Sequence, residues 1–332
     1  MSHAIHIGDC LEVLRGIPSN TFGGSLTDPP YGLNFMGKQW DKGVPSSTVW
    51  SEVLRVLKPG GHLLAFGGAR TFHRLTCAIE DAGFEIRDCL MWLYGTGFPK
   101  SHDMSKALDK AAAATPEDAK RFSGYGTALK PAWEPCIVAM KPVEGTFAAN
   151  ALAHGVAGLN IDGSRIGSDI VGWSGNPSDG YSGGLNNTET PRLVAGRWPA
   201  NLVLDESFTQ DWSRFFYCAK ASTAERDAGL SGVQISEKPG CYRDGFLGKK
   251  TEPRRNNHPC VKPIELNRYL ANLILPPPSN AARRLLVPFS GSGSEMIGGL
   301  LSGWDHAEGI EREAEYVNMA HERIKHWTNA KS

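Results

Sequence analysis

The chain has 332 residues, 41% of them apolar, which predicts one α/β core with an inserted or appended unit. Its 35 basic and 35 acidic side chains balance, which counts against a nucleic-acid-binding protein without excluding one, because acids elsewhere can offset a basic face. The seven cysteines form no CxxC pair, the N-terminus lacks a signal-peptide pattern, and no apolar run approaches about 20 residues. These features argue against a disulfide framework, a zinc site, secretion and a membrane span.

Strands and helices alternate along the N-terminal part of the chain. We expect strands at 4–8, 24–27, 62–66 and 85–94, and helices at 11–17, 49–57 and 71–82. The helix at 49–57 rests on apolar residues at helical spacing, and Pro59-Gly60-Gly61 follows it as a stop signal.

A second alternating stretch occupies the C-terminal part. Apolar spacing predicts helices at 264–274, 294–301 and 313–327, with strands at 284–287 and 307–310. Between the two stretches the pattern weakens, and the segment 172–191 is so rich in Gly, Ser, Asn and Pro that we expect a mobile loop.

A basic cluster lies near the end of this central region. It consists of Lys249, Lys250, Arg254 and Arg255, beside Asn256 and Asn257. Contact with nucleic-acid phosphates is one interpretation of such a cluster, and a solvated surface is the other.

The tetrapeptide Asp28-Pro29-Pro30-Tyr31 follows the second predicted strand. An exocyclic amino group of a base is a poor nucleophile because its lone pair is delocalised into the ring. A carboxylate at Asp28 and a carbonyl at Pro29, held by two rigid prolines, could each accept one amino N–H and localise that lone pair. Tyr31 offers a flat face for stacking a flipped base. An ordinary rigid turn is the alternative.

A glycine-rich turn follows the strand at 284–287. The segment Phe289-Ser290-Gly291-Ser292-Gly293-Ser294 allows close approach of a ligand to the backbone and opens a helix, whose first N–H groups are free. Met296 stands where a dinucleotide motif needs its third glycine, which disfavours a nicotinamide cofactor. Glu311 ends the next strand, where an acid suits the hydroxyls of a ribose.

Gly8-Asp9 also closes a strand. Asp9 could accept a hydrogen bond from an adenine amino group, but Asp at this position is more often a helix N-cap.

Together these segments resemble the permuted, or β-group, DNA amino-methyltransferases. In that family a DPPY motif comes first and an FxGxG cofactor loop comes last, as Asp28–Tyr31 and Phe289–Gly293 do here. His258-Pro259-Cys260-Val261-Lys262-Pro263 is similar to the family's HPxxKP segment, and Gly309-Ile310-Glu311 to its ribose-binding strand.

The resemblance implies a three-layer α/β fold with a mostly parallel sheet, of the S-adenosylmethionine-dependent methyltransferase type. Residues 1–144 would form the catalytic half, 145–255 a target-recognition insert, and 256–328 the cofactor-binding half. The cofactor would be S-adenosylmethionine, and no metal is expected. Its expected contacts are Asp9, Cys10, Asp28, His258, Lys262, Pro263, Phe289, Ser290, Gly291, Ser292, Gly293, Ser294 and Glu311, with Lys262 at the cofactor carboxylate.

The implied reaction is methylation of adenine N6 in double-stranded DNA by base flipping. Cytosine N4 is the alternative base, because the family's Asp-led tetrapeptides go mostly with adenine and its Ser-led ones with cytosine. Asp28, Pro29, Pro30 and Tyr31 would act on the base. A DNA-binding protein without catalysis and a glutamine methylase are more distant alternatives.

Other contacts to DNA are expected from two segments. The loop at 34–41, with Lys38 and Trp40, is placed to close over a flipped base, and the cluster at 249–257 to contact phosphates. A cytoplasmic enzyme of a bacterium or a phage-infected cell is implied, and a homodimer is compatible with the resemblance. A companion restriction enzyme does not follow from it.

One departure from the family concerns the cofactor loop. Where the family has an acid before Pro-Phe, this chain has Val287. One polar contact to the cofactor is therefore missing from its expected position.

Overall fold

The computed structural model describes residues 1–33, 41–95, 97, 101–111, 114–173, 192–219, 223–231, 255–256, 258 and 261–329. Several predicted residues and most of the glycine-rich segment at 172–191 lie outside these ranges. The residues concerned are Lys38, Trp40, Lys249, Lys250, Arg254, Asn257, Pro259 and Cys260.

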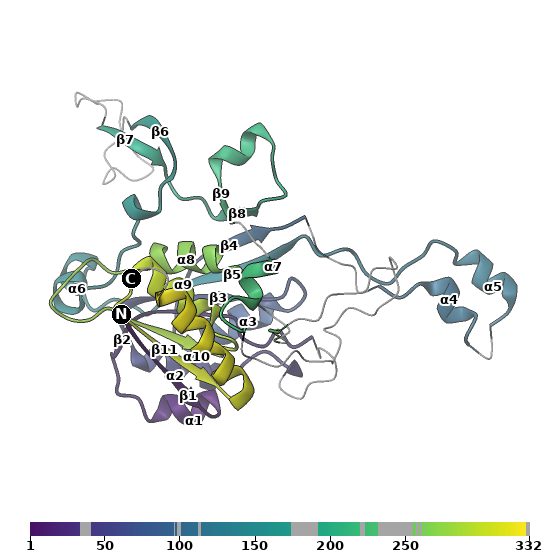
Figure 1. The fold of residues 1–332 in the computed structure, drawn as a ribbon, viewed down its shortest axis with the longest axis horizontal. Helices are drawn as coiled ribbons and strands as arrows, with labels where there is room; N and C mark the ends of the chain where they lie inside the picture. Colours follow the sequence, from purple (N-terminus) through teal and green to yellow (C-terminus); the bar gives the residue numbers. More distant parts are fainter. Residues whose placement is uncertain are drawn as a thin grey trace.

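A nine-stranded sheet forms the centre of the described structure (Figure 1). Its order is β1-β11-β10-β2-β3-β5-β4-β8-β9, and within it only β5 runs antiparallel to its neighbours. The strands are β1 (Ser2–Ile7), β2 (Phe22–Thr27), β3 (Leu57–Phe66), β4 (Glu85–Leu93), β5 (Trp133–Met140), β8 (Leu202–Asp205), β9 (Tyr217–Ala219), β10 (Arg284–Pro288) and β11 (His306–Glu311).

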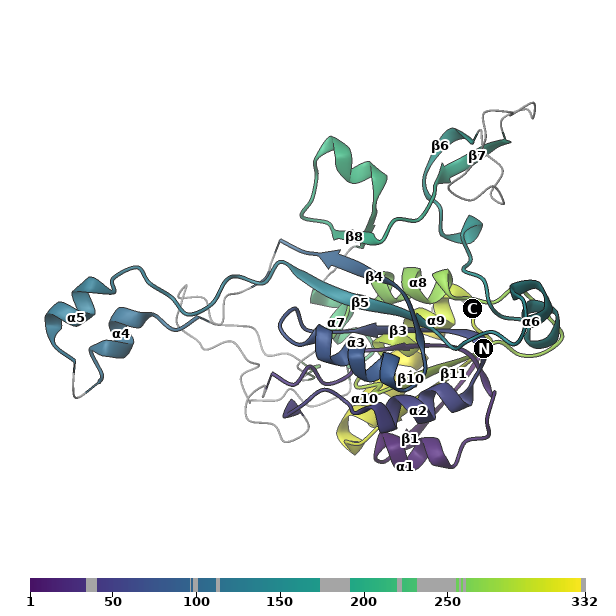
Figure 2. The same cartoon turned by 180° about the vertical axis from the view of Figure 1, so that it is seen from behind.

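Helices cover both faces of this sheet, as the two opposite views show (Figures 1 and 2). One face carries α1 (Cys10–Arg15), α2 (Ser47–Val56) and α3 (Phe72–Asp81), and the other carries α8 (Ile264–Leu273), α9 (Ser294–Ser302) and α10 (Ala314–Asn329). An apolar core lies on each face of the sheet, and alternate residues of β3 pack into one or the other. Leu63 and Ala65 pack toward α2 and α3, and Leu64 and Phe66 pack toward α8 and α9. The predicted three-layer fold with a mostly parallel sheet is confirmed.

Pairing of β2 with β10 joins the two halves of the chain. Gly24 lies opposite Leu285, and the Thr27 hydroxyl donates to the Pro288 carbonyl, 261 residues away in sequence. A Cβ atom at Gly24 would lie 3.1 Å from the Trp304 ring, so a glycine allows the close packing here. Because parallel strands end at one edge, Asp28 and the glycine-rich loop are brought together.

The remaining elements were not predicted, and neither were the sheet strands β5, β8 and β9. α4 (Met104–Leu108) and α5 (Pro116–Arg121) form an arm between β4 and β5 that extends far from the body (Figure 1). α6 (Phe147–His154), β6 (Ile166–Trp173), β7 (Arg192–Arg197) and α7 (Thr223–Asp227) lie in the predicted insert, with 3-10 helices at Asp162–Ser164 and Asp211–Phe215. Also within it, β8 pairs with β4, so part of the predicted insert continues the main sheet.

The strand β3 begins earlier than the sequence predicts. β3 begins at Leu57, five residues before the predicted strand, and runs through Pro59-Gly60-Gly61. Gly60 donates its N–H to the Lys141 carbonyl, and Lys141 donates its N–H to the Gly61 carbonyl. The residues that stop the helix therefore also form the first part of the strand.

None of the helices in the described ranges combines the length and apolar character needed to cross a bilayer.

Acid is expected to weaken the fold through His62 of β3. Burial, followed by the charge of Arg87, lowers the pKa of His62 from 6.5 to about 4. The unfolded chain therefore binds the proton first, and stability is lost as pH falls from 6.5 toward 4. Between about pH 7.5 and about pH 5 this loss is about 2 kcal/mol.

Urea unfolding of the His62→Gln variant at these two pH values measures the effect. The variant should lose less stability on acidification than the parent chain, whereas His73→Gln, at an exposed position of α3, should lose as much. An equal loss in the parent and His62→Gln would contradict the assignment.

Candidate active site

The tetrapeptide carboxylate is held by two side chains, one from the tetrapeptide itself and one from the C-terminal part of the chain. Tyr31 donates its hydroxyl to Asp28 Oδ1 at 2.7 Å, and Lys262 Nζ donates to Asp28 Oδ2 at 2.7 Å. Lys262 Nζ also lies 3.2 Å from Glu134 Oε2 and 3.0 Å from the Tyr31 hydroxyl. A carboxylate oxygen can accept more than one hydrogen bond, so Asp28 retains acceptor capacity for a ligand.

This ion-pair cluster is largely removed from solvent. The side chains of Lys262 and Asp28 are 6% and 9% exposed, and Lys262 Nζ lies 4.9 Å from the centre of the Phe66 ring. Burial, with the nearby charge of Glu134, raises the pKa of Tyr94, whose hydroxyl donates to Glu134 at 3.4 Å. The stability of this cluster depends on each of its members, because removing one member leaves another charge buried without a partner.

Neighbouring loops fix the backbone of the tetrapeptide. Thr71 donates its hydroxyl to the Tyr31 carbonyl at 2.6 Å, and Gly32 donates its N–H to Asp41 at 2.8 Å. Pro29 is buried. The Asp28 carboxylate therefore projects from a backbone that is rigid on both sides.

The glycine-rich loop turns sharply between β10 and α9. Phe289, Gly291 and Gly293 all have positive φ, at 58°, 49° and 81°. Gly291 donates its N–H to Glu311 Oε2 at 2.9 Å, and burial raises the pKa of Glu311. Glu311 thus holds the loop, in addition to its predicted role at a ribose.

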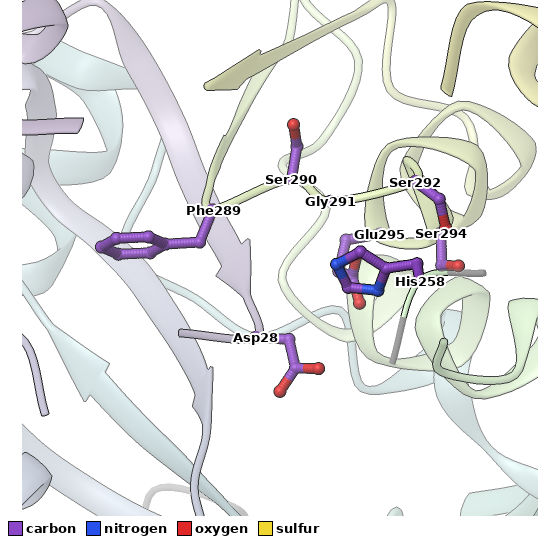
Figure 3. A pocket seen from close by; sticks show the side chains of 8 residues that line it. All are labelled: Asp28, His258, Phe289, Ser290, Gly291, Ser292, Ser294 and Glu295. Carbon is purple, nitrogen blue, oxygen red and sulfur yellow. The ribbon is translucent and has the colours of Figure 1, made fainter. Parts of the chain in front are cut away.

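A pocket lies between this loop and Asp28 (Figure 3). Its lining residues are Asp28, His258, Phe289, Ser290, Gly291, Ser292, Ser294 and Glu295. The Phe289 side chain points away from the pocket and packs against the core beneath α1 and α2, so that this residue offers its backbone to the pocket.

The groups around the pocket suit the amino-acid part of the cofactor that the resemblance predicts. A Cβ atom at Gly291 would lie 2.7 Å from His258 Nε2, so only glycine leaves room beside this ring. Gly293 caps α9 without a side-chain hydrogen bond, which leaves helix N–H groups suited to a carboxylate. Ser290 Oγ is buried without a hydrogen-bond partner in the described part of the chain. These groups fit an amino-acid ligand with polar atoms at both ends.

Asp9 and Cys10 lie at the end of β1, beside the same loop. Asp9 Oδ1 accepts hydrogen bonds from the N–H groups of Leu11 and Glu12, so it caps α1, as Asp at this position commonly does. Burial raises the pKa of the Cys10 thiol to about 12, and the thiol contacts the Phe289 backbone. Their contact with an adenine ring stays a prediction.

The structure corrects the prediction for Asn256. Its side chain is fully buried and donates to Ser292 Oγ at 3.2 Å and to the Arg226 carbonyl at 3.1 Å. A DNA contact is therefore contradicted, and Asn256 instead supports the glycine-rich loop. Arg255 is partly exposed and donates one Nη1 hydrogen bond to the Leu230 carbonyl at 3.1 Å.

Three polar residues of this site were missed in the sequence. Glu134, at the start of the antiparallel strand β5, reaches the same edge as Asp28. Arg323 donates to the Ser292 carbonyl at 2.6 Å, and Glu295 lines the pocket. Only Glu295 carried a sequence signal, since it directly follows the glycine-rich turn. Among the described side chains, no group of three or more His, Cys, Asp or Glu is arranged to hold a metal ion.

Comparison with known proteins gives one broad match. A protein-family model described as DNA methylase (N6_N4_Mtase) matches residues 24–322. This range includes both the tetrapeptide and the glycine-rich loop.

Individual relatives match shorter segments. The chain is 30% identical over 115 residues to the type II methyltransferase M.HindIII of Haemophilus influenzae, covering 33% of this chain and 37% of that protein. It is 33% identical over 73 residues to the type II methyltransferase M.BamHI of Bacillus amyloliquefaciens, covering 19% of this chain and 16% of that protein. The chain thus matches well under half the length of these curated relatives.

Among solved structures, the PvuII DNA methyltransferase (cytosine-N4-specific) superposes with a TM-score of 0.52 at 13% identity, covering 99% of this chain and 91% of that one. At this identity the likeness is one of fold. It confirms the predicted methyltransferase fold class.

Substitution of Gly291 by alanine should block the pocket. The new Cβ would overlap the His258 ring, so binding of S-adenosylmethionine should weaken by roughly tenfold or more. Isothermal titration calorimetry measures the affinity. Gly155→Ala is the matched control, because Gly155 has φ 73° but open space at its Cβ position. Both variants should lose about 1 kcal/mol of stability, and equal binding by both would contradict the account.

Removal of the Lys262 charge should destabilise the fold. Lys262→Met leaves Asp28 and Glu134 as neighbouring buried carboxylates, at a cost of about 3 kcal/mol in the free energy of unfolding. Adding Glu134→Gln removes one of those charges and should restore part of the loss. Urea unfolding of the two single variants and the double variant measures this coupling; strictly additive effects would show that the pairs contribute nothing.

Proposed function

The chain belongs to the N6/N4 family of DNA methylases, and we propose that it methylates the N6 amino group of adenine at a specific site in double-stranded DNA. The observation that carries the proposal is the buried Asp28 carboxylate facing the glycine-rich loop across one pocket. This arrangement sets a hydrogen-bond acceptor for a base opposite a cradle for a methyl donor.

S-adenosylmethionine is the methyl donor of this family and supplies an electrophilic methyl group on a sulfonium centre. The residues that would hold it are His258, the backbone of 289–293, the start of α9 and Glu311. The permuted order of the β group agrees with this distribution, since Asp28 lies on the N-terminal half and the loop on the C-terminal half.

Asp28 would orient the amino group. Its carboxylate accepts one amino N–H and the Pro29 carbonyl accepts the other, which directs the nitrogen lone pair toward the methyl carbon. When bound, the cofactor would supply the methyl group to this nitrogen, and the extra amino proton would leave to solvent. Asp28 acts as an acceptor that positions the nucleophile and stabilises the positive charge developing on it.

Lys262 and Tyr31 would keep Asp28 in position during this step. Both contact its oxygens at 2.7 Å, and Glu134 in turn contacts Lys262. These two contacts fix the orientation of the carboxylate and leave its remaining lone pairs for a ligand. The predicted contact of Lys262 with the cofactor carboxylate would add a third acid to the two, Asp28 and Glu134, that its ammonium already contacts.

The target base would reach this pocket only out of the helix stack, because Asp28 is largely buried. Adenine is the proposed base because the tetrapeptide is led by Asp28, as in the family's adenine enzymes. A bacterial or phage-infected cell, with the enzyme acting alone or beside a restriction enzyme, agrees with the type II methyltransferases among its relatives.

Single-molecule sequencing of DNA from a methylation-free host expressing the chain tests the proposal. The expected result is N6-methyladenine at one short motif, absent with Asp28→Ala because the acceptor is lost. The variant should still bind S-adenosylhomocysteine, which shows that it is folded. N4-methylcytosine would overturn the choice of base, and the absence of any modified base would contradict DNA methylation.

A further inference from the structure

Glu295 is an acidic side chain that the proposed reaction does not use. It lies in the first turn of α9, is only 5% exposed, and lines the pocket that Asp28 and His258 share (Figure 3). A carboxylate is costly to remove from water unless a positive partner compensates it. An acid buried at a ligand pocket therefore indicates a positively charged ligand group.

The protein supplies only part of that compensation. Asn267, which is fully buried, donates its amide to Glu295 Oε1 at 3.3 Å, and the backbone N–H of Glu295 also donates to this carboxylate. No ion pair to Glu295 is present among the described residues. Lys262 and Arg323 favour its charge from a distance, but Lys262 contacts Asp28 and Glu134. Burial, followed by the charge of Asp28, raises the pKa of Glu295 to about 7.

The other acid of the pocket lining, Asp28, already forms an ion pair within the protein. Among the lining residues only Asp28 and Glu295 carry carboxylates, and both oxygens of Asp28 accept hydrogen bonds from Tyr31 and Lys262. Val287 stands where the family resemblance leads one to expect an acid, and it is fully buried in an apolar core. Glu295 on α9 is therefore the acid of the pocket that forms no ion pair within the described residues, whereas the family's acid lies at the position of Val287 on β10.

We propose that the carboxylate of Glu295 binds the α-ammonium group in the methionine part of S-adenosylmethionine. The start of α9 would then receive both charges of the amino-acid moiety, its carboxylate at the N-terminus of the helix and its ammonium at Glu295. Glu295 would take the place of the acid that is missing at Val287. The inference rests on the cofactor assignment within the proposed function and is independent of the choice of base.

The test compares two ligands that differ in the ammonium group alone. They are S-adenosylhomocysteine and its deamino analogue, the carboxypropyl thioether of adenosine, and calorimetry measures the affinity of each for the full chain. Glu295→Gln should weaken binding of S-adenosylhomocysteine by roughly tenfold or more, because a buried charge pair is lost. Its affinity for the deamino analogue should stay within about twofold of the parent's.

Glu308→Gln is the matched control, since Glu308 is similarly buried but pairs with His6 and Arg284 outside the pocket. It should bind both ligands as the parent chain does. Equal weakening of both ligands by Glu295→Gln would show a structural role, and no weakening of either would show no role; each overturns the proposal. A parent chain that binds neither ligand would overturn it together with the cofactor assignment, whereas N4-methylcytosine in cellular DNA would leave it intact.

Discussion

The parallel pairing of β2 with β10 is the constraint on which the site depends. It aligns Gly24 with Leu285, and so brings Asp28 and the glycine-rich loop to one edge of the sheet although they lie in opposite halves of the chain. Close packing of Trp304 against Gly24 helps to fix this register. A slip by one residue would turn every side chain of β2 to the opposite face, which both buried cores oppose.

The charged side chains at the edge of the sheet that carries Asp28 form two groups, one proposed to serve the base and the other the cofactor. Asp28, Glu134 and Lys262 form one buried ion-pair cluster, which holds the acceptor proposed for the base. Glu295 belongs to the second group, at the start of α9, where the cofactor's amino-acid end is expected. The cofactor carries two positive charges and one negative charge, so an extra acid in the pocket is electrostatically reasonable.

Six strands of the sheet and the helices beside them were predictable because their signals are local, namely apolar runs bounded by Gly and Pro. The two sides of the site were predictable from a glycine-rich turn and a rigid tetrapeptide. The central strand β5 was not predicted. Glu134 was not predictable, since it is a single acid that the antiparallel direction of β5 brings to Asp28. Asn256 was misassigned because its basic neighbours suggested a surface, whereas tertiary packing buries it beneath the loop. In the described part of the arm between β4 and β5, the helix signals are the N-cap Asp103 and the capping box of Thr115 and Asp118, on helices of only five and six residues.

We propose that Asp28 and the glycine-rich loop form two walls of one active site. A crystal structure of the chain with S-adenosylhomocysteine tests this most directly. We predict that the ligand lies along 289–293, with its adenine toward Cys10, its amino-acid end at the start of α9, and its sulfur facing the Asp28 carboxylate. A ligand bound elsewhere, or one whose sulfur faces away from Asp28, would contradict the claim.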